Sequence, residues 1–266
     1  MEEYKGVAYE RHQLLQHLGD ALKPGQVMIL ELLIVLIASI AQGLTGFGFS
    51  LIAVPLLSLI LPFGQVVPIV VGLSLFSNLV MILKLYRHVE LKKIWLLVVF
   101  GFIGIPIGGY ILLVVEAVIL KVLVGLFIFV FAILLLLRIT FPIRNEYLAF
   151  PIVGILSGLL NGSISASGPP LVLFLTNQGK DQQVFKANLA FYGVFLNIST
   201  IVVFVMNGTL NREVTTMIVQ LLVIMIVGTV IGMAVAKKID KDMFRKLVIY
   251  LLLVSSVWMI LGAIVF

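Results

Sequence analysis

Long apolar segments separated by short polar loops fill the chain after residue 26. Most of them are close to the roughly 20 residues that an α-helix needs to cross the hydrocarbon core of a bilayer, and two are longer. The pattern predicts eight apolar segments, at 27–61, 66–83, 94–115, 117–137, 147–176, 188–206, 214–236 and 243–265. We therefore expect an all-α polytopic membrane protein.

The N-terminal segment before the first apolar run is polar. Acidic residues crowd its start and no small-residue cleavage site follows, which argues against a signal peptide. Apolar residues recur at helical spacing between Tyr4 and Leu22, as in an amphipathic helix that lies on a membrane surface. The expected units are an amphipathic segment at 1–26, a first transmembrane repeat at 27–138 and a second, inverted one at 147–266.

The composition supports a membrane protein and excludes several kinds of chemistry. Hydrophobic residues make up 62% of the chain and charged residues 11%, against roughly 45–50% and 25% in a typical globular protein. There is no cysteine, and His12, His17 and His88 lie outside the apolar segments without a metal-ligand spacing. We therefore expect no metal, no cofactor and no enzymatic activity. The net charge of +6 comes from loop residues, so we expect no nucleic-acid partner.

Lysine and arginine predict the orientation in the membrane, because cytoplasmic loops are enriched in them. Loop 84–93 contains four of these residues and loop 237–246 contains five, so both should be cytoplasmic. Of the 18 lysines and arginines, 13 then lie inside, including Lys180 and Lys186. Five lie outside: Lys5, Arg11, Lys23, Lys121 and Arg212.

This orientation makes the long segment 147–176 begin and end on the same side. It should therefore be a hairpin of two half-helices, with its break within 161–170, which is rich in serine and glycine. Segment 27–61 should be its mirror image from the outside, with its break within 43–50. The tips of the two hairpins should meet near the middle of the membrane.

Four landmarks recur in the same order in the two halves, which indicates an inverted repeat. Secondary transporters often combine inverted repeats with broken helices, and their substrate site lies between the repeats. The landmarks are Gly43 to Pro55 with Gly158 to Pro170, Asn78 with Asn197, Gly104-xxx-Gly108 with Gly228-xxx-Gly232, and Lys121 and Leu123 with Arg245 and Leu247.

The paired motifs resemble those of the TauE/SafE sulfite exporter family over roughly residues 27–265. The first motif runs from Gly43 to Ser50 with Val54-Pro55-Leu56, and the second from Gly158 to Gly162 with Gly168-Pro-Pro-Leu171. The consecutive glycines usual in that family are replaced here by Phe-Gly-Phe-Ser and by Ser-Ile-Ser-Ala-Ser-Gly. The resemblance implies a multi-pass protein of a bacterial or archaeal plasma membrane. It also implies export of a small anion, which is either an organosulfonate such as sulfoacetate or sulfite.

The two breaks are the candidate anion site, because a second helix begins at each of them. Its positive dipole end, free amides and neighbouring hydroxyls can hold an anion. The alternative is that serine and glycine only let helices pack closely. No lysine or arginine lies deep in a predicted span, so neutral donors should hold the anion. The expected substrate-binding residues are Gln42, Thr45, Gly46, Phe47, Gly48, Phe49, Ser50, Asn78, Asn161, Gly162, Ser163, Ser165, Ser167, Gly168, Tyr192 and Asn197.

Three other functions are alternatives to a secondary transporter. An anion channel can use the same scaffold, and a membrane factor without transport activity is a second alternative. A membrane enzyme is disfavoured because the apolar segments offer no evident base, nucleophile or metal site. The expected partners are a small anion and the lipid bilayer, with a homodimer as an alternative to a monomer.

Overall fold

The protein is all-helical in the residues that its computed structural model describes, which are 24–137, 146–176, 181–236 and 241–265. Six of the described helices, α2, α4, α5, α6, α9 and α10, are long and apolar enough to cross a membrane. Two more contain shorter apolar stretches, Leu148–Ile164 and Val248–Ala263. The prediction of an all-α polytopic membrane protein is confirmed. The helices are α2 (Pro24–Thr45), α3 (Phe49–Leu57), α4 (Phe63–Leu85), η1 (Tyr86–His88), α5 (Leu91–Val114), α6 (Ala117–Leu136), α7 (Glu146–Ile164), α8 (Gly168–Thr176), α9 (Gln182–Met206), α10 (Arg212–Val235) and α11 (Lys241–Val265).

Polar side chains cap the start of two helices, α9 and α10. The Asp181 carboxylate accepts the amide of Gln183 (3.1 Å) at the start of α9. The Asn211 side chain accepts the amide of Val214 (2.9 Å) at the start of α10. Such caps satisfy amides that the first turn of a helix leaves without an intrahelical acceptor. The expected amphipathic helix within 1–26 lies outside the described residues, except that α2 already begins at Pro24.

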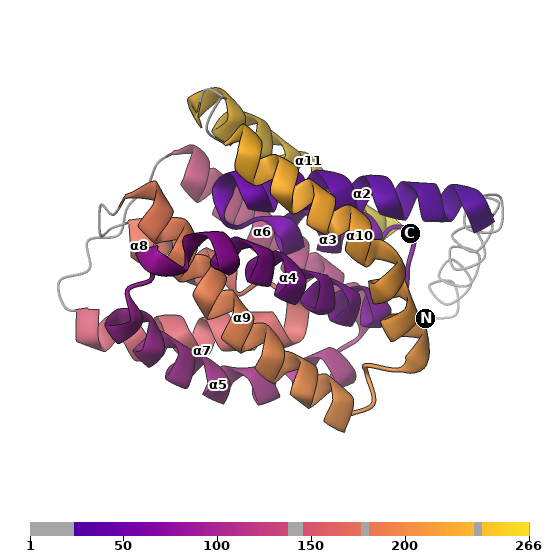
Figure 1. Cartoon of the computed structure of the whole chain (residues 1–266). Coiled ribbons are helices and arrows are strands. Elements are labelled where there is room, and N and C mark those ends of the chain that lie inside the picture. Colours follow the sequence, from indigo (N-terminus) through magenta and orange to yellow (C-terminus); the bar gives the residue numbers. More distant parts are fainter. Residues whose placement is uncertain (1–23, 138–145, 177–180, 237–240, 266) are drawn as a thin grey trace.

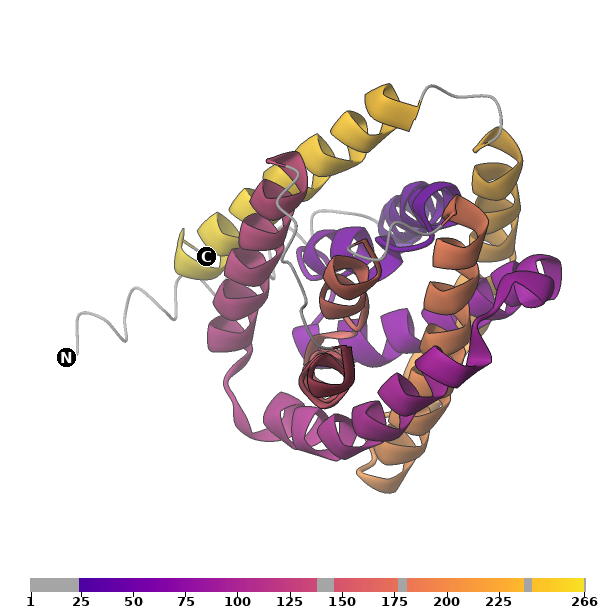
Figure 2. The same cartoon turned by 90° about the vertical axis from the view of Figure 1, so that its left-hand side faces the viewer.

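The two short helices lie inside the bundle of long ones. Most side chains of α3 and α8 are buried, among them Phe49, Leu57, Leu171 and Phe174. Helices α6 and α11 pack against each other and line one side of the bundle (Figure 2). Many large apolar side chains on the outer faces of the long helices are exposed, as expected for surfaces that contact lipid.

The two hairpins differ from the prediction in one respect. The first limbs are not half-helices: α2 has 22 residues and α7 has 19, whereas α3 and α8 have nine each. At about 1.5 Å per residue, α2 is long enough to cross the hydrocarbon core. The breaks themselves lie within the predicted ranges, at 46–48 and 165–167, but Gly43 and Asn161 still belong to the first helix of each hairpin.

Glycines bring α5 and α7 into close contact. A Cβ added at Gly162 would lie 2.5 Å from the carbonyl oxygen of Ile105, and one at Gly104 would lie 2.6 Å from the amide nitrogen of Leu159. Added Cβ atoms at Gly108 and Gly158 would also overlap backbone atoms of the facing helix. These helices can approach only where no side chain separates them, which is a common mode of packing between transmembrane helices.

The same kind of contact joins α2 to α10. A Cβ at Gly43 would lie 2.8 Å from the amide nitrogen of Met233, and Cβ atoms at Gly228 and Gly232 would overlap atoms of α2. The two Gly-xxx-Gly motifs therefore serve helix packing. It also explains why Gly43 stays helical and does not belong to the break.

The two halves of the chain make equivalent contacts. The first α-helix of each half packs against the fourth α-helix of the other, α2 against α10 and α7 against α5. The hydrogen bond from Gln42 to Asn78 has its counterpart in the bond from Asn161 to Asn197, and equivalent residues are 119 positions apart. This spacing differs by four residues, about one helical turn, from the 115 positions that separate Gly43 from Gly158. Figure 1 shows α2 beginning at the right and α7 at the left. Opposite insertion of the two repeats in a membrane stays a prediction.

The helices that follow the loops expected to be cytoplasmic begin at one end of the bundle. Helices α5, α7, α9 and α11 begin there, at the left of Figure 1. The backbone amide of Glu90, just before α5, donates to the Asn188 side chain near the start of α9 (2.9 Å). Arg144 and Lys180, which the sequence also places inside, lie outside the described residues.

Because the chain has no cysteine, single introduced thiols can test this orientation. We expect cysteines replacing Lys92 or Asp181, both exposed, to be blocked by membrane-permeant maleimide but not by impermeant maleimide in intact cells. A cysteine replacing the exposed Arg212 should react with both reagents. Labelling of the Lys92 and Asp181 variants from opposite sides would contradict the hairpin formed by α7 and α8.

Candidate functional site

The first break separates α2 from α3 at residues 46–48. Gly46 (φ 90°) and Gly48 (φ 106°) adopt left-handed backbone conformations, which favour glycine. Gln42 holds the break: its Nε2 donates to Oδ1 of Asn78 (3.0 Å), and its Oε1 accepts the amide of Phe49 (3.1 Å). The Gln42 side chain therefore links α2, α3 and α4 at this point.

Thr45 stabilises the backbone of the same break. Its Oγ1 is 2.8 Å from the carbonyl oxygen of Ala41, and it accepts the amide of Phe47 (3.2 Å). The hydroxyl also contacts the carbonyl oxygen of Phe47. Because these contacts are to backbone groups, Thr45 shapes the break and does not line the cavity described below.

The second break separates α7 from α8 at residues 165–167. Ser165 has a φ of 59° and is the single non-glycine with positive φ in the described part of the chain. Such a conformation costs roughly 1–3 kcal/mol. Ser165 is 3% exposed, and its Oγ has no hydrogen-bond partner among the described residues. A buried hydroxyl without a partner costs about 1–3 kcal/mol, which suggests that it serves a ligand.

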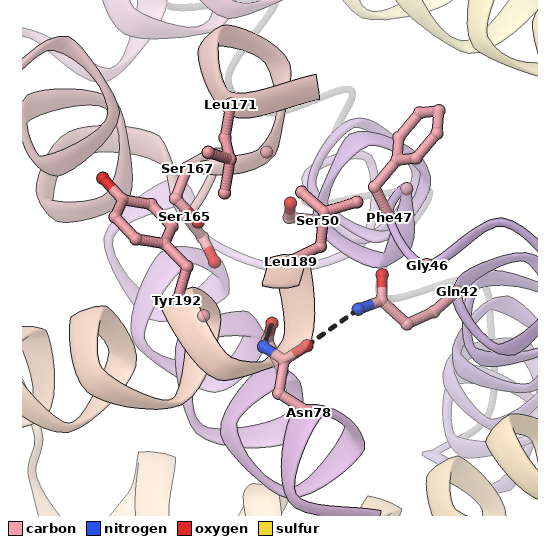
Figure 3. A pocket seen from close by; sticks show the side chains of 14 residues that line it. Gln42, Gly46, Phe47, Ser50, Asn78, Ser165, Ser167, Leu171, Leu189 and Tyr192 are labelled. Atoms are coloured by element: carbon pink, nitrogen blue, oxygen red, sulfur yellow. Dashed lines mark hydrogen bonds between the residues drawn. The ribbon is translucent and has the colours of Figure 1, made fainter. Parts of the chain in front are cut away.

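A cavity of about 30 Å³ lies between the two breaks (Figure 3). The breaks approach each other there, because a Cβ added at Gly168 would lie 3.7 Å from the Cβ of Phe47. The tips of the two hairpins therefore meet around one cavity, as the paired motifs predict. The lining residues are Gln42, Gly46, Phe47, Gly48, Ser50, Ser74, Asn78, Ser165, Ser167, Gly168, Leu171, Leu189, Tyr192 and Gly193.

The cavity offers neutral hydrogen-bond donors from two helix N-termini. Ser50 belongs to the first turn of α3, so its amide points toward the break, as the first amides of any helix do. In α8, Pro169 and Pro170 have no amide hydrogen, so in the first three residues only Gly168 supplies one. Hydroxyl groups therefore matter more at the second break than at the first.

Ten of the sixteen predicted substrate-binding residues line this cavity. Six do not: Thr45, Phe49, Asn161, Gly162, Ser163 and Asn197. Those six make other contacts. Thr45 and Ser163 bond to backbone carbonyls, the amide of Phe49 bonds to Gln42, and Gly162 contacts α5.

Asn161 and Asn197 form a second polar cluster, which is not part of the cavity. Nδ2 of Asn161 donates to Oδ1 of Asn197 (3.1 Å) and to Oγ1 of Thr200 (2.8 Å). All three side chains are buried, with 1% or less of their surface exposed. This cluster is the counterpart of the bond between Gln42 and Asn78. It connects α7 to α9, so Asn161 stabilises the packing of these helices and does not face the cavity.

Four lining residues were not predicted. Ser74 lies one turn before Asn78 on α4 and accepts a long hydrogen bond from Nδ2 of Asn78 (3.5 Å). Gly193 follows Tyr192 on α9, and a Cβ there would overlap the Asn78 amide. Helical spacing around Asn78 could have identified Ser74. Nothing in the sequence distinguishes Leu171 and Leu189 from other buried leucines.

Phe47 lies at the rim of the cavity. Its ring makes edge contacts with Phe131 of α6 (ring centroids 6.2 Å apart) and Phe185 of α9 (6.5 Å). Figure 3 shows the ring directed away from Gln42 and Asn78. Phe47 thus contributes to the wall, and its ring does not point toward the polar groups of Gln42 and Asn78.

The expectation about charge requires a correction. The sequence predicts Lys186 in a cytoplasmic loop, because the apolar segment of this region begins at residue 188. In the structure α9 begins at Gln182, and Lys186 is 8% exposed. Its Nζ donates to the carbonyl oxygen of Gly43 (3.3 Å), beside the first break. A buried cation therefore lies close to a site that was expected to contain neutral groups alone.

Comparison with known proteins identifies one family. The family described as Sulfite exporter TauE/SafE matches residues 31–259, which is most of the chain. No curated protein and no solved structure matches the chain.

Proposed function

We propose that the chain, which belongs to the sulfite exporter TauE/SafE family, exports a small sulfur-containing anion. This anion is either an organosulfonate such as sulfoacetate or sulfite. It is a multi-pass membrane protein of a transporter family. We place it in the plasma membrane of a bacterium or archaeon. The anion binds in the cavity between the two breaks.

Ser165 is the observation that carries this assignment. Its hydroxyl is buried and lines the cavity, and it has no hydrogen-bond partner among the described residues. The residue also keeps a left-handed backbone where the equivalent residue in the first half is Gly46. A protein tolerates such strain and an unsatisfied hydroxyl where a ligand completes the hydrogen bonds.

The size of the cavity suits the head group of the proposed substrates. A water molecule needs about 10–15 Å³ of such volume, so 30 Å³ accommodates a group of a few heavy atoms. Sulfite and the sulfonate group of an organosulfonate are of this size. The rest of an organosulfonate extends past Phe47, Ser50 and Ser167, where the lining is partly exposed.

The membrane potential is sufficient to drive export. An inside-negative potential contributes about 2.3 kcal/mol per charge per 100 mV to the expulsion of an anion. Transport of this kind needs no proton relay, which agrees with a lining made of amides, hydroxyls and apolar groups.

Ligand-induced stabilisation of the purified protein tests the function. We expect sulfite and sulfoacetate to raise the thermal unfolding midpoint, because a ligand at 100 times its Kd adds about 2.7 kcal/mol of stability. Acetate and glycolate serve as anions without sulfur. In proteoliposomes, efflux should saturate with substrate concentration. Currents far above transporter turnover would indicate a channel, and no response to any sulfur anion would contradict the proposal.

Removing the Ser165 hydroxyl should weaken binding without destabilising the fold. Ser165→Ala and Ser165→Gly each lose one hydrogen bond to a charged ligand, which corresponds to roughly 1–2 kcal/mol, or about 5- to 30-fold in Kd. Glycine also relieves the positive φ. The glycine variant should therefore be at least as stable as wild type and still bind weakly, as measured by isothermal titration calorimetry.

Ser255→Ala is the matched control, because Ser255 is equally buried but lies on α11 and bonds to the carbonyl oxygen of Leu252 (3.1 Å). Its affinity for sulfite should equal that of wild type. If both Ser165 variants bind as tightly as wild type, Ser165 does not contact the anion.

A further inference from the structure

Lys186 is a buried cation pressed against the first break. Its aliphatic stem covers Gly46, since a Cβ added at Gly46 would lie 2.8 Å from Cγ of Lys186. Its Nζ donates to the carbonyl oxygen of Gly43 in the last turn of α2 (3.3 Å). The neighbouring Phe185 contacts Phe47, so two consecutive residues of α9 lie against the break. Lys186 does not itself line the cavity, whereas Gly46 and Phe47 do.

The end of α2 by itself opposes the binding of an anion. The last carbonyl groups of a helix have no intrahelical donors, and they form the negative end of its dipole. Helix α2 ends at Thr45, directly before Gly46, Phe47 and Gly48, which line the cavity. The start of α3 attracts an anion, but the end of α2 repels it, and the two effects oppose each other at this break. A cation bound to a carbonyl of the last turn removes the repulsion.

We propose that Lys186 sets the charge selectivity of the cavity, so that it binds anions and favours doubly charged over singly charged sulfur oxyanions. This inference rests on the proposed function, since it concerns the same site. Lys186 acts through the electrostatic potential and does not touch the anion. Amides and hydroxyls hold the sulfonate or sulfite oxygens, and Lys186 makes the potential at the cavity positive.

A potential and a structural contact have different consequences. The electrostatic energy of a ligand in a potential is proportional to its charge. Removing the cation therefore leaves a neutral ligand unaffected, weakens a monoanion and weakens a dianion further. If Lys186 only capped α2, its removal would lower stability and would weaken ligands of every charge alike.

The test compares three ligands that share a sulfur head group and differ in charge: dimethyl sulfone, methanesulfonate and sulfoacetate. We expect wild-type affinity to rise in that order. Lys186→Met should lose about tenfold in affinity for methanesulfonate and more for sulfoacetate, with less than about twofold change for dimethyl sulfone. Lys186→Arg should keep the order, because it keeps the charge.

Lys92→Met is the matched control. Lys92 is exposed and lies in the first turn of α5 at the same end of the bundle, so the variant removes the same charge away from the break. Its affinities should equal those of wild type. The three affinities measured on the wild-type protein test the inference without any variant. Equal affinities for dimethyl sulfone and methanesulfonate would overturn it even if Lys186→Met did not fold.

The outcomes separate this inference from the proposed function. If wild type binds the anions and folded Lys186→Met binds them equally well, the role of Lys186 is refuted and the transport site stands. Equal losses for all three ligands would assign Lys186 a structural role only. If wild type binds no sulfur anion, the proposed function fails, and the inference about Lys186 fails with it.

Discussion

Transport should be lost, with folding preserved, when Gly168 is replaced by valine. Gly168 lines the cavity, and a Cβ added there would lie 3.7 Å from the Cβ of Phe47, an ordinary van der Waals distance. Alanine therefore fits, whereas the two further methyl groups of valine occupy the space between the breaks. We expect Gly168→Ala to transport at a reduced rate. Gly168→Val should lose about 3 kcal/mol in binding, or roughly 100-fold.

Efflux from proteoliposomes measures this effect, and the thermal unfolding midpoint shows whether the fold is intact. Gly64→Val is the control, because Gly64 lies near the start of α4 and an added Cβ there would meet no atom within 4 Å. If folded Gly168→Val transports like wild type, the anion does not pass between the breaks. Gly48, a lining glycine of the first break, is less suitable for this test, since its φ of 106° strains any side chain.

Replacing Gly158 with alanine should prevent the protein from folding stably. A Cβ at this position would overlap the carbonyl oxygen of Gly101 and would lie 2.8 Å from its carbonyl carbon. Because these are backbone atoms, no side-chain rotation relieves the overlap, and α7 must move away from α5. The close contact of the two helices, which includes Gly104 and Gly108, is lost with that movement. We expect a cost of about 3 kcal/mol or more.

The yield of monodisperse protein and the unfolding midpoint in detergent measure this cost. Gly64→Ala provides the same chemical change where there is space, and it should behave like wild type. A Gly158→Ala protein with an unchanged midpoint would show that α5 and α7 are farther apart than in the structure.

The bilayer explains why the sequence predicts so much of this fold. A helix must be about 20 apolar residues long to cross the hydrocarbon core, and its backbone groups must all be bonded. The apolar segments and their two interruptions therefore follow directly from the sequence. Close packing between transmembrane helices requires small residues, so the Gly-xxx-Gly motifs also predict their contacts.

The candidate site is only partly determined in this way. The sequence indicates which residues interrupt helices, and ten of the lining residues are predicted from it. It does not indicate which residues of the two halves are equivalent. The sequence motifs pair Gly43 with Gly158, whereas in the structure Gly46 and Ser165, both with positive φ, are equivalent, a difference of four residues. A shift of four residues keeps the same helix face, so the pattern of small residues fits both registers.

The class of fold and the two broken hairpins follow from the sequence alone, because the membrane imposes length, polarity and backbone pairing on each segment separately. The paired motifs indicate the family. The tertiary structure decided which polar groups face the cavity. Ser165 lacks a partner and Asn161 does not, although both lie at the second break. The tertiary structure also decided that Lys186 is buried. A hydrophobicity pattern assigns a lysine to water, but the carbonyl groups at the end of α2 give its charge a place inside the protein.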